Sequence, residues 1–179
     1  MRKDLFAIPI FEERIDLERI ILYESEYHPT FESGLLTTMK KQRVKPTTSD
    51  YIIEVFKPCL ESLGDNFSNI VVDQVWRNKY SSTDYQGYHI HPHTQWSFII
   101  YETIEQSKTM FIHPAMIQIQ NQIHSTSKAM PIHYEPNLEA GHIIFFPSFL
   151  GHQVRPGNTG QTIAGNIFVT YCDLSLIHI

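Results

Sequence analysis

The chain has 179 residues, of which 42% are hydrophobic and 18% charged. This length and composition predict one ordered globular domain over residues 1–179, rather than a disordered chain. The net charge of −5 argues against electrostatic binding of nucleic acid as the main task. The sequence contains no stretch of 18 apolar residues, so no membrane-spanning segment is expected.

The cysteines and the first residues bear on the cellular compartment. Cys59 and Cys172 lie far apart in the sequence, without the spacing of a metal site or a disulfide framework. This cysteine usage indicates a reducing compartment, and we expect the protein to be cytoplasmic. The N-terminus has no long apolar stretch, so no signal peptide is expected.

The N-terminal part, residues 1–69, is predicted to form a helical and irregular cap. Residues 5–11 predict an edge strand, because they are mostly apolar but contain a proline. Residues 16–23 fit either a short strand or a helical turn, and the pattern does not decide between them. Residues 29–46 are predicted to be irregular.

One longer helix is predicted in this part. It should begin at residues 48–50, Thr-Ser-Asp, because apolar residues then recur near helical spacing as far as Leu63. Pro58 is expected to kink or restart the helix, since proline lacks an N–H and clashes with the preceding turn. Gly64 is expected to end it.

From about residue 70 the pattern changes to short β-rich segments separated by Gly, Pro and Ser. The predicted strands are residues 70–76, 95–101, 108–112, 142–146 and 162–171, with 117–120 as a further candidate and 121–131 as a polar loop. About eight short strands at this spacing predict an all-β sandwich or barrel. Its core should span about residues 70–172, with the N-terminal helices packed outside.

A histidine-rich segment, Gln-Gly-Tyr-His-Ile-His-Pro-His, occupies residues 86–93. Alternate side chains of a strand share a face, so His89, His91 and His93 are expected to point the same way. Imidazole is the commonest protein ligand for transition metals near neutral pH. The segment therefore predicts half of a metal site, although a solvated histidine loop stays open as an alternative. His93 also stays open as a ligand in place of His89.

The other half of the site is expected from His152. A glycine opens a turn at residue 141, four apolar residues follow as a buried strand, and Pro-Ser ends it. His152 then stands at the start of the next predicted strand. The 61 residues from His91 to His152 are enough for the strands between them.

Together these motifs resemble the 2-oxoglutarate- and Fe(II)-dependent oxygenases of the double-stranded β-helix fold, a cupin-like jelly roll. The resemblance is closest to a branch of small proteins frequent in marine bacteria and their phages. The similar residues are Trp76-Arg77-Asn78, His89-x-His91-Pro92, Ser97, Tyr101, residues 141–154 and Gly165-Asn166. The resemblance covers about residues 70–170, and the two histidine-containing blocks carry its specificity.

The resemblance implies an enzyme with Fe(II) held by His89, His91 and His152. His91 stands where many relatives have a carboxylate, which makes the site less anionic by one charge. The implied reaction is a hydroxylation in which decarboxylation of 2-oxoglutarate is coupled to oxidation of the substrate.

Relatives usually place an arginine about ten residues after the distal histidine, to pair with the far carboxylate of 2-oxoglutarate. Neither arginine nor lysine occurs there in this sequence; the nearest candidate substitute is Arg155, and Arg77 on a neighbouring strand is another. The candidates for holding 2-oxoglutarate are Asn78, Arg155, Gln161 and Thr162.

Two other functions stay open. The all-histidine ligand set and the missing arginine also fit a three-histidine cupin-type metalloenzyme that does not use 2-oxoglutarate. The other is a jelly-roll protein that binds a ligand without catalysing a reaction, since fold does not determine function. The expected substrate is a small molecule or a peptide side chain, with no nucleic-acid or membrane partner, and a homodimer stays open.

Overall fold

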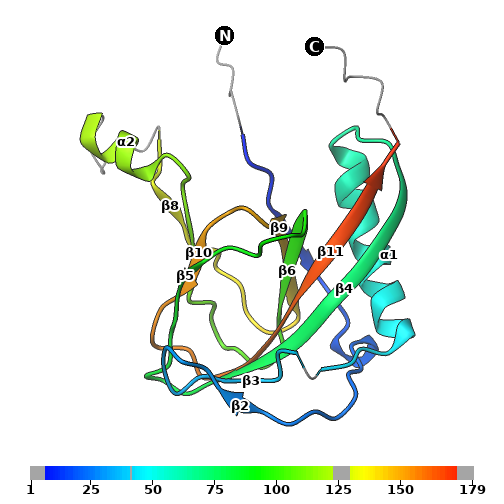
Figure 1. Ribbon diagram of the computed structural model, residues 1–179, viewed down its shortest axis with the longest axis horizontal. Coiled ribbons are helices and arrows are strands. Elements are labelled where there is room, and N and C mark those ends of the chain that lie inside the picture. The colour runs from blue at the N-terminus through cyan, green and yellow to red at the C-terminus, as the bar shows by residue number, and fades with distance from the viewer. Residues whose placement is uncertain (1–6, 41, 123–129, 173–179) are drawn as a thin grey trace.

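The computed structural model describes residues 7–40, 42–122 and 130–172 and consists of two antiparallel sheets with a helix on one outer face (Figure 1). The larger sheet has the order β1-β9-β6-β11-β4-β3-β2 and the smaller has the order β5-β10-β7-β8. From β4 onward the chain passes repeatedly from one sheet to the other. This alternation is the double-stranded β-helix that the sequence predicts.

The strands of the larger sheet, in chain order, are β1 (Phe11–Arg14), β2 (His28–Pro29), β3 (Leu36–Thr37), β4 (Phe67–Tyr80), β6 (Trp96–Tyr101), β9 (His142–Pro147) and β11 (Gly160–Tyr171). Those of the smaller sheet are β5 (Gln86–His89), β7 (Thr109–Ile112), β8 (His133–Tyr134) and β10 (His152–Val154). The long strands β4 and β11 are paired along their whole length and form the middle of the larger sheet.

The pairing of β4 with β11 contains a β-bulge. Gly165 lies opposite Val75, whereas Ile167 lies opposite Val72, so β4 has one more residue than β11 in this interval. The break in the ladder falls at Asn166. Bulges of this kind change the direction in which a side chain points.

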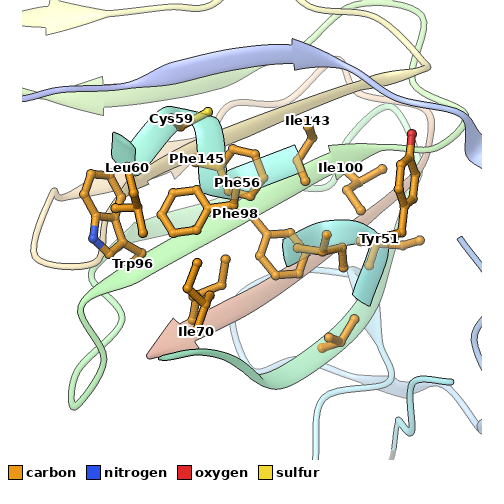
Figure 2. Packing of buried hydrophobic residues seen from close by; sticks show 14 of the residues in the cluster. Tyr51, Phe56, Cys59, Leu60, Ile70, Trp96, Phe98, Ile100, Ile143 and Phe145 are labelled. Carbon is orange, nitrogen blue, oxygen red and sulfur yellow. The ribbon is translucent and has the colours of Figure 1, made fainter. Parts of the chain in front are cut away.

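A hydrophobic core lies between the outer face of the larger sheet and helix α1 (Pro46–Ser62) (Figure 2). Phe56 of the helix is fully buried, with its ring centroid 5.3 Å from that of Trp96 and 4.7 Å from that of Phe145. A second cluster fills the space between the two sheets and includes Phe111, Phe146 and Leu150. The larger sheet therefore packs against α1 on one face and against the smaller sheet on the other.

The predicted helix is confirmed, with one correction. It begins at Pro46 and passes through Pro58 as one helix, so a restart at that residue is wrong. Gly64 follows its end as predicted, with φ +79° and its N–H donating to the carbonyl of Glu61. Glycine adopts this left-handed conformation without the steric penalty of a Cβ.

Other elements differ from the sequence prediction. Residues 117–120 do not form a strand but belong to helix α2 (Met116–Gln122), which buries only Ile119. The alternation of apolar and polar residues there is too short to separate the two structures. The first strand covers residues 11–14, later than predicted, and Leu17–Arg19 form a short 3₁₀ helix. Residues 5, 6 and 123–129 lie outside the described residues.

The described part of the chain has no helix of the length and apolar character needed to cross a membrane.

We expect Phe56→Ala to lower the free energy of unfolding by about 3–5 kcal/mol, because it leaves a cavity between the helix and the larger sheet. Urea denaturation measures the difference. Lys57→Ala is the matched control, since Lys57 is exposed and its ion-pair partner among the described residues is the exposed Glu61; its effect should stay within about 0.5 kcal/mol. Equal effects of the two substitutions would show that α1 does not pack as described.

Candidate metal centre

Three histidines meet between the two sheets. His89 ends β5 and His152 begins β10, and the two residues face each other directly in the antiparallel ladder. His91 follows just after β5, where its backbone N–H donates to the carbonyl of Ser148 at 3.0 Å. One side-chain nitrogen from each histidine lies within 4.8 Å of the other two. A single metal ion can be coordinated by three nitrogens at this spacing.

The hydrogen bonds of His89 and His152 set their tautomers. Nδ1 of His89 lies 2.8 Å from the carbonyl oxygen of Gly87, and Nδ1 of His152 lies 3.0 Å from that of Leu150. Because a carbonyl oxygen only accepts, Nδ1 carries the proton in both rings and Nε2 keeps a free lone pair. Metal-binding histidines are commonly oriented by such a bond.

His91 is held by side chains instead of a backbone carbonyl. Its Nδ1 lies 2.7 Å from Oδ1 of Asn166 and 2.9 Å from Oγ of Ser97. Ser97 in turn bonds Oγ of Ser148 at 2.7 Å, and the amide nitrogen of Asn166 donates to Gln74 at 3.4 Å. The latter bond turns the amide oxygen of Asn166 toward His91. His91 therefore also donates from Nδ1 and leaves Nε2 free.

Burial keeps these rings uncharged. His152 is 2% exposed and His91 is 8% exposed. Desolvation lowers the pKa of His91 to about 4, partly opposed by its bond to Asn166, and lowers that of His152 well below its ordinary value. Desolvation also lowers the pKa of His89. Neutral imidazoles bind metal without first losing a proton, so the cluster fits a divalent transition metal.

A cavity between the sheets adjoins the three histidines. Half of its other lining residues come from β4 and β11; the full set is Trp76, Asn78, Tyr80, Gln86, Ile99, Thr109, Val154, Asn158, Thr162 and Ala164. This lining is a mixture of apolar, hydroxyl and amide groups. Among the residues that the structure describes, no lysine or arginine lines the cavity.

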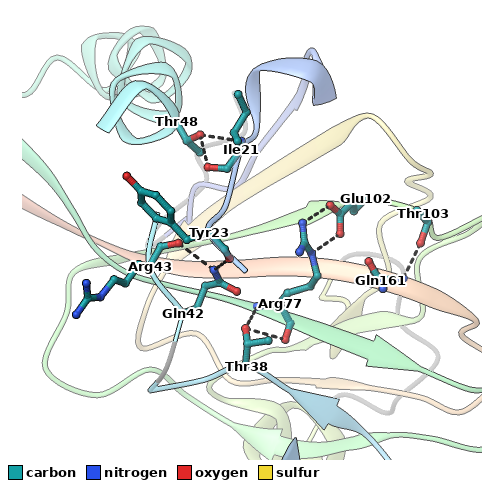
Figure 3. A network of polar contacts seen from close by, with 10 residues as sticks. All are labelled: Ile21, Tyr23, Thr38, Gln42, Arg43, Thr48, Arg77, Glu102, Thr103 and Gln161. Atoms are coloured by element: carbon teal, nitrogen blue, oxygen red, sulfur yellow. Dashed lines mark hydrogen bonds and ion pairs between the residues drawn. The ribbon is translucent and has the colours of Figure 1, made fainter. Parts of the chain in front are cut away.

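Two of the residues predicted to hold 2-oxoglutarate line this cavity. Asn78 and Thr162 lie opposite each other on β4 and β11, and both are buried. Gln161 does not line the cavity, because neighbouring residues of a strand point to opposite faces. Its backbone N–H donates to Oγ1 of Thr103 at 2.8 Å, away from the cavity (Figure 3).

The two arginines considered as substitutes are also outside the cavity lining. Arg155 forms an ion pair with Glu135, and its side chain is 47% exposed. Arg77 donates to both carboxylate oxygens of Glu102 at 2.7 and 2.6 Å (Figure 3). Its neighbours Trp76 and Asn78 line the cavity, so Arg77 points to the other face of β4. Both guanidinium groups are therefore already paired with a carboxylate.

The prediction that His89, His91 and His93 share one face of a regular strand is wrong for the residues after His89. β5 ends at that residue, and Pro92 and His93 form a turn in which His93 is exposed with φ +65°. The structure brings His89, His91 and His152 together and leaves His93 out. His91 reaches the cluster through its bond to Ser148, not through the regular alternation of a strand.

Sequence reasoning missed Tyr80 and Asn158 as cavity residues. Tyr80 follows Asn78 by two positions on the same strand, so alternation alone identifies it. Asn158 lies between β10 and β11, where no local pattern indicates the direction of a side chain.

A protein-family model described as "Putative 2OG-Fe(II) oxygenase" matches residues 74–163, half of the chain. The chain belongs to this family. The predicted enzyme class, with Fe(II) and 2-oxoglutarate as cofactors, is thereby confirmed. Similarity to a marine bacterial and phage branch stays a prediction. No curated protein sequence matches this oxygenase.

Solved structures agree on the fold of this oxygenase. An oxidoreductase of the 2OG-Fe(II) oxygenase family from Burkholderia pseudomallei is 11% identical, with a TM-score of 0.53, covering 80% of this chain and 72% of that one. A prolyl-4-hydroxylase from Pseudomonas putida is 12% identical, with a TM-score of 0.50, covering 83% and 79% respectively. At these identities the similarity concerns the double-stranded β-helix.

We expect the metal-free oxygenase to lose stability as the pH falls below 6.5. The unfolded chain then protonates its histidines, whereas the buried rings stay neutral until the pH approaches their lowered pKa. For His91 the loss reaches on the order of 3 kcal/mol near pH 4. The measurement is urea denaturation with EDTA at a series of pH values.

His91→Gln should reduce this acid-dependent loss, because glutamine does not titrate. His93→Asn is the matched control, since His93 is exposed and asparagine tolerates its left-handed backbone. If the two variants lose stability with the same pH dependence, the buried His91 is not the source.

Proposed function

We propose that His89, His91 and His152 are the Fe(II) ligands of this oxygenase and that the enzyme hydroxylates its substrate. The supporting observation is the shared arrangement of the three rings. Each engages Nδ1 in a hydrogen bond and leaves Nε2 free, with candidate ligand atoms within 4.8 Å of one another. Three ligands leave coordination positions open for 2-oxoglutarate and O₂.

Bound Fe(II) supplies the oxidative chemistry of 2-oxoglutarate decarboxylation and substrate oxidation. The protein's own contribution is to orient the ligands and restrict access of water to their far side. The ring of His152 packs against Phe146 and Phe111, with centroid separations of 4.8 and 5.6 Å. Trp76 lies beside His91 at 5.5 Å. Trp76 also lines the cavity, so one of these rings forms part of the wall beside His91.

The substrate is proposed to be a small molecule or a peptide side chain. The fold similarity to a prolyl-4-hydroxylase makes a proline-containing peptide the first substrate to test. A cytoplasmic location is proposed because Cys59 and Cys172 are unpaired.

Replacing a ligand tests the metal site. We expect His91→Ala and His152→Ala each to lower Fe(II) affinity by at least a hundredfold and to abolish succinate formation. The readouts are metal content after anaerobic loading and the visible absorption of the Fe(II)–2-oxoglutarate chelate. His93→Ala is the matched control from the same segment and should retain both. Full metal binding by His152→Ala would contradict the ligand assignment.

Asn166 should act on the metal through His91. We expect Asn166→Leu, which keeps the branched shape of the side chain, to lower Fe(II) affinity about 10- to 100-fold, because the ring of His91 loses the nearer of its two hydrogen-bond partners. Asn158→Leu is the control, since Asn158 lines the same cavity but makes no hydrogen bond to a histidine among the described residues. Equal metal affinity in the two variants would contradict this role.

A further inference from the structure

The side chains that line the cavity do not balance the negative charge of 2-oxoglutarate. 2-Oxoglutarate carries two carboxylates, yet no lysine or arginine of the described residues lines the cavity. The nearby Arg77 and Arg155 lie outside it and are paired with Glu102 and Glu135. A doubly charged ligand in a buried site needs both hydrogen bonds and compensating charge.

Hydrogen-bond donors are present on the larger sheet. Tyr80 is 4% exposed, and burial raises its pKa, so its hydroxyl keeps its proton. It donates a long hydrogen bond of 3.4 Å to Oε1 of Gln86. Thr162 and Asn78 lie opposite each other on the paired strands and line the same cavity as Tyr80. Three neutral polar groups therefore meet at one place in the cavity wall.

Asn158 supplies a second, independent observation. It lines the same cavity and is only 2% exposed, yet its Oδ1 has no hydrogen-bond partner in the described structure. Buried polar atoms are nearly always paired. An amide can turn to present either its oxygen or its NH₂ group, so Asn158 is available to donate to a ligand.

Charge compensation comes from the metal ligands. Fe(II) on three neutral imidazoles keeps its two positive charges, which equal the two negative charges of 2-oxoglutarate. In the two-histidine, one-carboxylate arrangement the same complex has a net charge of −1. A lysine or arginine then restores neutrality. An all-histidine site reaches neutrality without that cation.

We propose that the far carboxylate of 2-oxoglutarate is bound here by the neutral donors Tyr80, Thr162 and Asn158. We further propose that His91, in place of a carboxylate ligand, compensates for the absent cation. The inference rests on the proposed function, since it requires Fe(II) on the three histidines. Thr162 stands ten residues after His152 and lines the cavity.

The first test measures the dissociation constant of 2-oxoglutarate for the anaerobic Fe(II)-loaded protein by chelate absorption and calorimetry. Tyr80→Phe and Thr162→Val each remove one hydroxyl while keeping the shape, and each should weaken binding about tenfold at unchanged Fe(II) affinity. Arg155→Gln is the control and should leave binding unchanged. A loss with Arg155→Gln, or no loss with both hydroxyl variants, overturns the proposal.

The second test uses 2-oxopentanoate, which has the same chain length but lacks the far carboxylate. It should bind the wild-type protein at least tenfold more weakly than 2-oxoglutarate does. Tyr80→Phe and Thr162→Val should not weaken it further, because the group they contact is missing. Equal binding of the two acids overturns the proposal.

The third test addresses the charge directly. His91→Asp should weaken 2-oxoglutarate binding in protein that still holds Fe(II), and adding Thr162→Lys should recover it. No recovery overturns the compensation by His91. Measuring the metal content distinguishes failure of the ligand assignment from failure of this inference alone. A wild-type protein without metal overturns the ligand assignment and this inference together, whereas metal binding with unaltered 2-oxoglutarate affinity in every variant overturns this inference alone.

Discussion

The pairing of β5 with β10 is the contact on which the candidate metal centre depends. It sets His89 directly opposite His152, and each ring is then fixed by a carbonyl two residues earlier in its own segment. Backbone atoms therefore position two of the three rings, without a further side chain. A site built on paired backbone needs little rearrangement when a ligand enters, which is the advantage of a preorganised centre. Only His91 depends on side chains from other strands.

Neighbouring residues in the strands of the larger sheet alternate between the face that packs against α1 and the face that lines the cavity. On β11, Thr162 faces the cavity, whereas Ile163 is buried in the core beneath α1. The same alternation sends Arg77 to the outer face and its neighbours Trp76 and Asn78 to the cavity. A substitution on the cavity side therefore changes the site without removing a contact with α1. This separation lets the cavity accept an unusual set of polar groups within a conventional hydrophobic scaffold.

The sequence was informative where a short pattern determines the structure. The apolar period predicted α1, and the two histidine-containing blocks predicted the residues that the fold brings together. Prediction failed where a distant contact decides. His93 was assigned to the strand, but β5 ends at His89 and the chain turns. Gln161 and Arg155 have suitable chemistry, but strand direction and partner carboxylates take them away from the cavity. The position of Asn158 depends on the packing of a loop, for which no local pattern exists.

The bulge at Asn166 links the alignment of the larger sheet to the histidine cluster. If β11 were displaced by one residue, Gly165 or Ile167 would take the place of Asn166, and neither side chain can accept a hydrogen bond from His91. Gly165 also resists replacement, because a Cβ there would lie 2.6 Å from the carbonyl oxygen of Gln74. A misaligned sheet would therefore leave Nδ1 of His91 without its bond to Asn166. The alignment of β4 and β11 and the orientation of the buried His91 ring thus depend on the same residue, Asn166.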